Sequence, residues 1–127
     1  MRKFFLLMLL AVSSNNAGAE WFKIGGNETD TLYTDSTTII RSAHKVRMQS
    51  LYDNKTAMKA AGETFMSIAL QEEYDCNENQ ARTLYFSFHT GKLGKGRKIY
   101  SDTERHKWEF VRPGSLREIL LKFACKK

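Results

Sequence analysis

The two cysteines, Cys76 and Cys125, are the residues whose chemistry the sequence constrains most closely. They do not form a redox Cys-x-x-Cys motif, so they are two free thiols, an intermolecular bridge or the two ends of one disulfide. In an exported domain two cysteines usually form one intramolecular bridge, because the compartment is oxidising. Such a bridge would close a loop of about fifty residues and stabilise the fold by roughly 4 kcal/mol.

Export is indicated by the first 19 residues, which have the features of a secretory signal peptide. Residues 1–3 are positively charged, residues 4–12 are apolar, and residues 17–19 (Ala-Gly-Ala) match a cleavage site. This apolar run is far shorter than the roughly 20 residues that span a bilayer. No cysteine follows it closely, so we expect no lipid anchor. We therefore expect cleavage after Ala19, no transmembrane segment, and a mature chain in the periplasm, at the cell surface or secreted.

Residues that could serve in catalysis or metal binding show only weak patterns. His44, His89 and His106 lack the spacing of a metal-binding or catalytic motif. Ser115 lies in a Pro-Gly-Ser sequence that suits a helix cap better than the turn that presents a nucleophile. We therefore predict no catalytic residue, no metal and no cofactor.

A group of carboxylates follows a β-forming run. In a strand Glu73 and Asp75 would share one face and Glu72 would lie on the other. We interpret these residues as a solvated surface and not as an acid–base pair.

Basic residues are concentrated in the last third of the chain. Residues 91–127 contain 11 Lys or Arg and 4 Asp or Glu, whereas residues 20–90 contain 7 and 10. Such a face can attract polyanions or acidic proteins, and a solvated face without a ligand is an equally good interpretation. Tyr100 and Trp108 lie among these residues, and we expect both in the core. The candidate ligand-binding patch comprises Lys92, Lys95, Arg97, Lys98, Arg105 and Lys107.

Short β-forming segments and one terminal helix must position these residues. Residues 53–63 have no clear pattern and indicate a short helix or a mobile loop, and residues 91–96 (GKLGKG) indicate a flexible connection. Short turns between the other segments favour antiparallel pairing. We expect strands within residues 21–24, 32–34, 37–41, 45–52, 64–75, 82–89, 97–100 and 107–111.

The last fifteen residues predict an amphipathic helix. Ser115 and Glu118 have the spacing of a capping box. The apolar stripe comprises Leu116, Ile119, Leu120, Phe123 and Ala124. A helix this short needs a surface to pack on. The sequence therefore predicts one α+β domain over residues 20–127: a mostly antiparallel sheet of about six strands with a C-terminal helix packed on it.

Several residues, taken in order, resemble a known family. Trp21 opens the mature chain, and Asp75-Cys76, Trp108, Pro113-Gly114-Ser115 and Cys125 follow. This order resembles the bacterial surface-adhesin protein E family over essentially the whole mature chain. The resemblance implies an antiparallel sheet with a C-terminal helix, bridged cysteines and adhesion to host matrix or serum proteins. It also implies a homodimer as one arrangement.

We therefore predict an exported, non-enzymatic binding protein that contacts host matrix or serum proteins, or polyanions, through its basic surface. The alternative is a periplasmic structural or accessory module that binds another cell-envelope component. A small hydrolase without a recognisable motif is a third interpretation. Export and the lack of a known nucleic-acid-binding module argue against a nucleic-acid partner.

Overall fold

The computed structural model describes residues 19–126. Residues 1–18 of the expected signal peptide and Lys127 lie outside this part. The strands are β1 (Phe22–Gly26), β2 (Asp30–Ser42), β3 (Lys45–Ala60), β4 (Glu63–Asp75), β5 (Gln80–His89), β6 (Lys98–Asp102) and β7 (Glu109–Phe110). The helices are a short 3₁₀ helix, η1 (Lys92–Gly94), and α2 (Leu116–Cys125).

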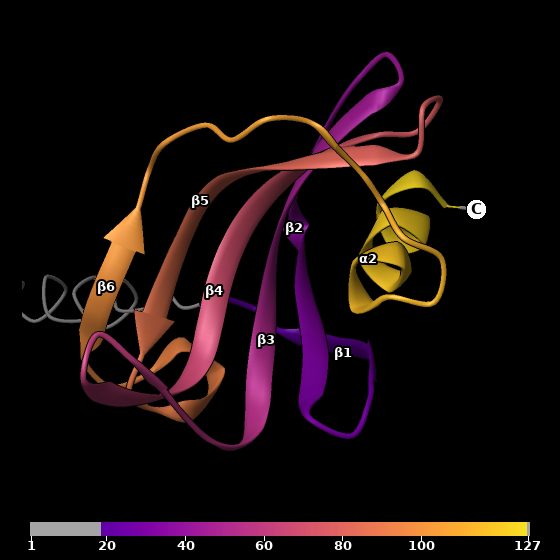
Figure 1. Cartoon of the computed structure of the whole chain (residues 1–127). Coiled ribbons are helices and arrows are strands. Elements are labelled where there is room, and N and C mark those ends of the chain that lie inside the picture. Colours follow the sequence, from indigo (N-terminus) through magenta and orange to yellow (C-terminus); the bar gives the residue numbers. More distant parts are fainter. Residues whose placement is uncertain (1–18, 127) are drawn as a thin grey trace, which may run out of the picture.

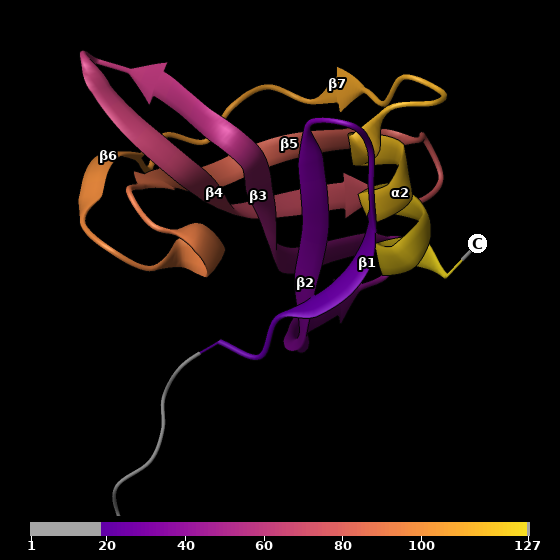
Figure 2. The ribbon, with the colours of Figure 1, turned by 90° about the horizontal axis from the view of Figure 1, so that it is seen from below.

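The strands form one antiparallel sheet. Strands β1 to β6 are neighbours in sequence order, and β7 pairs with β5. The sheet bends strongly, and α2 lies beneath the bend beside β1 (Figures 1 and 2). These features confirm the predicted α+β fold class. Within residues 19–126, no helix is long and apolar enough to cross a membrane.

The expectation of a short helix or loop over residues 53–63 is wrong. Strand β3 continues to Ala60, and the hairpin turns at Ala61 and Gly62, both with positive φ. The β3–β4 register shifts between Asp53 and Met58, and residues 55–59 are exposed. Because neither face of this stretch is buried, its sequence lacks the alternation that marks a strand.

The two strands expected within residues 32–41 are one strand, β2, with a register shift between Asp35 and Ile40. Asp35 is buried, and its carboxylate accepts hydrogen bonds from the Thr37 hydroxyl (2.5 Å) and from the amides of Thr37 (3.0 Å) and Glu20 (3.1 Å). Thr38 Oγ1 in turn accepts the Gln49 amide at 3.0 Å. Side chains thus provide the hydrogen bonds that the irregular strand lacks.

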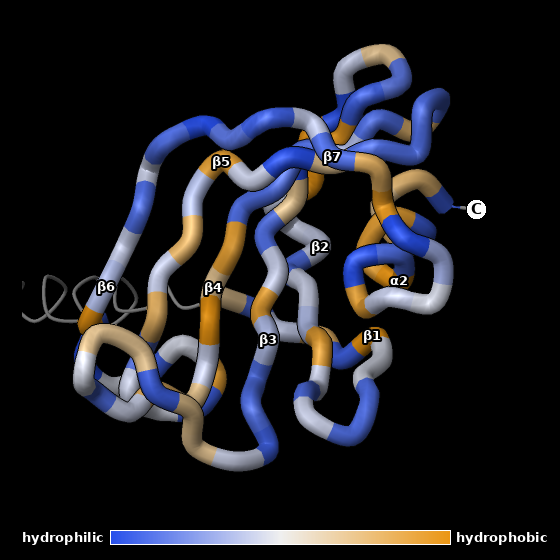
Figure 3. The backbone as a smooth tube through the Cα atoms, in the orientation of Figure 1, coloured by the Kyte–Doolittle hydropathy of each residue, from blue (hydrophilic) through white to orange (hydrophobic). Residues whose placement is uncertain are grey.

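The hydrophobic core lies between α2 and the bent end of the sheet. Figure 3 shows hydrophobic segments along β4, β5 and α2, and hydrophilic residues along the coil between β6 and β7. The buried core residues are Leu32, Val46, Met48, Tyr74 and Ala81 of the sheet, Val111, and Leu120, Leu121 and Ala124 of α2.

Local interactions define both ends of α2, and the predicted capping box is present at its first turn. The Glu118 amide donates to Ser115 Oγ at 3.2 Å, and the Glu118 carboxylate accepts from the Gly114 amide at 2.9 Å. The helix ends at Cys125, and the next residue, Lys126, caps it in a left-handed conformation. The predicted Cys76–Cys125 disulfide is present and fastens this end to the turn after β4.

The expectation of a solvated carboxylate face at the end of β4 is wrong, most clearly for Glu72. Its side chain is buried, with the residue 3% exposed, and Arg117 Nε and Nη2 donate to Oε2 at 3.1 and 2.8 Å. Tyr74 and Thr83 also donate to this carboxylate. Burial lowers the pKa of Arg117, but the charge of Glu72 and the hydrogen bonds that Arg117 donates to Glu109 and Glu72 outweigh burial, so the pKa is raised. The ion pair therefore joins α2 to the sheet.

Glu73 and Asp75 are buried as well. Arg82 donates twice to Glu73 Oε1, at 2.9 and 2.7 Å, and Arg47 lies 3.7 Å from Oε2. Asp75 accepts backbone amides of the following turn and lies 3.6 Å from His44. All three carboxylates thus have structural partners.

Candidate functional site

The glycine-rich connection between β5 and β6 is held against the sheet, contrary to the expected flexible loop. Ser67 Oγ donates to the Gly91 carbonyl at 2.6 Å and accepts the Gly94 amide at 2.9 Å. The Leu93 amide donates to Asp53 Oδ1 at 2.8 Å. Both acceptor side chains are buried, so the loop has fixed anchors in β3 and β4.

Gly96 closes this loop at a position that excludes a larger residue. Its φ is +78°, and an added Cβ would lie 2.4 Å from Thr90 Oγ1 and 2.7 Å from the Gly91 amide nitrogen. Backbone bonds from Thr90 to Arg97 and from Gly91 to Lys95 complete the turn. The loop therefore presents its lysines from a preformed backbone.

The four basic residues of this region have different surroundings. Lys92 Nζ donates to the Asn54 carbonyl at 2.7 Å and lies 3.5 Å from Asp53, so it belongs to the loop's anchor. Arg97 pairs with Glu63 at 2.9 Å across two exposed side chains. Lys98 lies 3.4 Å from the Tyr85 hydroxyl. Lys95 is exposed on the loop and has no ion pair with any residue in the described part.

Arg105 and Lys107 lie elsewhere. They belong to the exposed coil between β6 and β7, which runs along the upper edge of the sheet in Figure 1, whereas the glycine-rich loop lies at the lower end. The structure thus divides the six predicted residues into a loop group (Lys92, Lys95, Arg97 and Lys98) and a coil group (Arg105 and Lys107).

The two aromatic residues expected in the core are not in it. Tyr100 is 46% exposed and lies 5.8–5.9 Å from the rings of Phe86 and Phe88. Trp108 is half-buried, with the Arg82 guanidinium 4.5 Å and Lys45 Nζ 5.4 Å from its ring centroid. Trp108 therefore packs against cations of β3 and β5.

A shallow hollow of about 530 Å³ lies beside the loop group. Trp21, His89, Leu93 and Lys95 contribute to its lining. No local motif marks Trp21 or His89 as site residues, because the residue before β1, the last residue of β5 and the loop come together only in the folded chain. The hollow places an indole and an imidazole next to an exposed ammonium group.

His89 does not form a catalytic pair with its neighbour. Ser87 Oγ lies 2.8 Å from His89 Nε2, but Ser87 is 1% exposed. A buried hydroxyl cannot reach an external substrate, so this contact does not supply a nucleophile. Burial, and secondarily the charge of Lys98, lowers the pKa of His89, which favours the neutral imidazole.

Metal ligands are not gathered in the part of the chain that the structure describes. Residues 19–126 contain no cluster of three or more His, Cys, Asp or Glu side chains arranged to hold a metal ion. His44 lies near Asp75, and His106 lies 3.4 Å from Asp102.

Several solved structures share this fold. Crystal form II of Haemophilus influenzae protein E is 12% identical, with 89% of this chain and 92% of that chain covered and a TM-score of 0.68. A second Haemophilus influenzae protein E structure is 11% identical, with 89% of each chain covered and a TM-score of 0.64. Protein E from non-typeable Haemophilus influenzae is 12% identical, with 89% and 77% covered and a TM-score of 0.57. At these identities the similarity shows a shared fold.

No curated protein sequence matches the chain. The sequence model of surface-adhesin protein E, in contrast, matches residues 21–126, which is almost the whole of the described part. This match confirms the resemblance inferred from the order of Trp21, Asp75-Cys76, Trp108 and Cys125. The chain therefore belongs to the surface-adhesin protein E family.

Proposed function

We propose that this protein is an exported, non-enzymatic adhesin that binds an acidic partner through the loop group. The partner is a host matrix or serum protein, or a polyanion such as a glycosaminoglycan. Family membership supports adhesion as the general role. The alternative, a periplasmic accessory module that binds an envelope component, uses the same fold without surface display.

The observation that carries the proposal is the fixed backbone beneath Lys95 and Lys98. Hydrogen bonds between the loop and the side chains of Ser67 and Asp53 order the loop before any partner arrives. A preordered surface loses less conformational entropy on binding than a mobile loop does. Lys95 extends from this support and lines the same hollow as Trp21, an aromatic residue of the kind that often anchors protein interfaces.

The structure indicates which substitutions can test this proposal without disturbing the fold. Lys92 anchors the loop and Arg97 pairs with Glu63, so reversing their charges would confuse binding with stability. Lys95→Glu with Lys98→Glu changes the charge of the loop group while leaving its anchors in place. Arg105→Glu with Lys107→Glu makes the same change in net charge at the coil group.

Binding to immobilised heparin and to a panel of matrix proteins should be measured for the chain from Glu20 onward. The loop variant should bind at least about ten times more weakly than the unmodified chain, and the coil variant should bind nearly as well. Equal losses of binding in both variants would show that binding depends on net charge alone and not on the loop group. Unchanged binding by the loop variant would show that the loop group does not contact the partner.

Homodimerisation remains a separate prediction from the family resemblance. Sedimentation velocity over a range of protein concentrations tests it directly. A single species with the mass of one chain at all concentrations would contradict it.

A further inference from the structure

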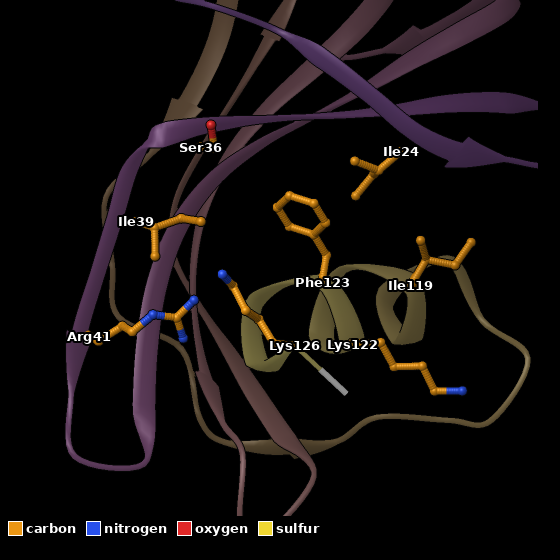
Figure 4. A pocket seen from close by; sticks show the side chains of 8 residues that line it. All are labelled: Ile24, Ser36, Ile39, Arg41, Ile119, Lys122, Phe123 and Lys126. Carbon is orange, nitrogen blue, oxygen red and sulfur yellow. The ribbon is translucent and has the colours of Figure 1, made fainter.

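A groove of about 740 Å³ lies between α2 and the β1–β2 edge of the sheet (Figure 4). Four apolar side chains contribute to its lining: Ile24 of β1, Ile39 of β2, and Ile119 and Phe123 of α2. Phe123 points from α2 into the space between the Ile24 and Ile39 side chains (Figure 4). The groove therefore offers apolar surface drawn from three separate elements.

The fold keeps these three elements in place. The Cys76–Cys125 disulfide fixes the C-terminal end of α2, and Arg41 Nη1 donates to the Ala124 carbonyl at 2.8 Å. The register shift in β2 begins after Asp35 and includes Ile39. The groove is thus bounded by a cross-linked helix and an irregular strand, and its opening does not depend on a partner.

Its charged lining is entirely basic. Arg41, Lys122 and Lys126 contribute to the groove, and no acidic side chain does so among the described residues. Figure 4 shows the Arg41 and Lys126 side chains converging on the groove, whereas Lys122 points outward. Lys122 lies 3.8 Å from Glu118 of the same helix. Two cations thus lie at one end of an apolar floor.

Arg41 is oriented in a way that suits a carboxylate. Its Nη1 is engaged by the Ala124 carbonyl. This bond leaves the edge formed by Nε and Nη2, which is an edge with which a guanidinium binds a carboxylate through two parallel hydrogen bonds. Lys126 adds a second positive charge from the residue that ends α2.

These features define the chemistry of an occupant. The groove volume falls within the roughly 300–1,000 Å³ of small-molecule sites. A folded protein partner would need about 800 Å² on each side, much more than eight lining side chains provide. An apolar floor with cations at one end matches a molecule with one hydrocarbon chain and one anionic head.

We propose that this groove binds a long-chain fatty carboxylate, with its chain on the Ile24, Ile39 and Phe123 floor and its head between Arg41 and Lys126. This site lies apart from the loop group and does not depend on the adhesin proposal. The four apolar residues bind the chain by burial. The two cations favour a carboxylate over a neutral or positive head of the same chain length.

Titration with dodecanoate below its micelle-forming concentration, followed by NMR of the isotopically labelled chain from Glu20 onward, tests the proposal. Resonances of Ile24, Ile39, Ile119 and Phe123 should shift together and saturate. Dodecyltrimethylammonium, which has the same chain and the opposite charge, should leave them unchanged or bind at least about tenfold more weakly.

Paired variants distinguish binding in the groove from nonspecific effects of a substitution. Ile39→Asp should weaken dodecanoate binding at least about tenfold, whereas Ile40→Asp, at the adjacent 60%-exposed isoleucine outside the groove, should not. Lys126→Gln should weaken it about three- to five-fold, whereas Lys59→Gln at the far end of β3 should have no effect.

Two results would overturn the proposal. Equal binding of dodecyltrimethylammonium and dodecanoate would show that the cations do not select the head. Absence of dodecanoate shifts in the groove, together with saturable shifts from an acidic amphipathic peptide, would identify a peptide site instead.

Discussion

Replacing Arg117 with methionine should destabilise the fold strongly, because it removes the cation that pairs with a carboxylate beneath α2. Glu72 is 3% exposed and accepts two hydrogen bonds from Arg117. Removing one partner of a buried ion pair typically costs 3–5 kcal/mol. Tyr74 and Thr83 would still donate to Glu72, so we expect the lower end, about 3 kcal/mol.

Urea denaturation of the oxidised chain from Glu20 onward measures this loss, and thermal unfolding should show a fall in Tm of roughly 10–15 °C. Arg47→Met is the matched control. Its partner Glu73 keeps both hydrogen bonds from Arg82, and Arg47 is partly exposed, so we expect a loss below about 1 kcal/mol. Similar losses for the two variants, or a loss below about 1 kcal/mol for Arg117→Met, would refute the reasoning.

Three further predictions concern stability. Replacing Cys76 and Cys125 with serine should lower the free energy of unfolding by about 4 kcal/mol, measured by urea denaturation without reductant; an unchanged midpoint would contradict this. Burial alone would raise the pKa of Asp35, but its hydrogen bonds outweigh burial and lower the pKa. Its stabilisation is therefore complete above the unfolded-state pKa of about 3.9 and is lost as the pH falls through the lower folded-state value. Asp35→Asn should cost about 1–2 kcal/mol at pH 7 and reduce the slope of stability against pH below about pH 4; an unaltered slope would argue against this role. Gly96→Ala should cost about 2–3 kcal/mol because of both its positive φ and the clash, whereas Gly62→Ala, also at positive φ but with no atom nearby, should cost only about 1 kcal/mol; equal costs would show that the clash is relieved.

Features that depend on neighbouring residues could be predicted from the sequence. The Ser115–Glu118 cap and the stripe on α2 follow from spacings of three and four residues, and the structure confirms both. The disulfide could be predicted because the chain has only two cysteines. The family could be predicted because its framework residues keep their order.

Features that depend on distant residues could not be predicted. Glu72 meets Arg117 across 45 positions, so the sequence offered no partner and suggested a solvated face. The glycine-rich loop has the composition of a flexible connection, and its anchors, Asp53 and Ser67, lie in strands that are distant in sequence. The end of β3 was missed because its exposed residues leave no hydrophobic alternation.

The same dependence on distant residues limits what the sequence predicts about the basic residues and the groove. The six basic residues are close in sequence, but the structure places Arg105 and Lys107 on the coil after β6, whereas the loop group lies before and at the start of that strand. The groove beside α2 joins Ile24, Arg41 and Phe123, which no local pattern connects. The sequence therefore identifies the basic residues but does not show how the folded chain arranges them.

Protease shaving of intact host cells, followed by fractionation and detection with an antibody, tests most directly whether this protein acts as a surface adhesin. We predict that protease removes the protein from intact cells while a periplasmic marker remains protected. Survival of the protein during shaving, with release in the periplasmic fraction, would contradict the adhesin role and favour an accessory module of the cell envelope.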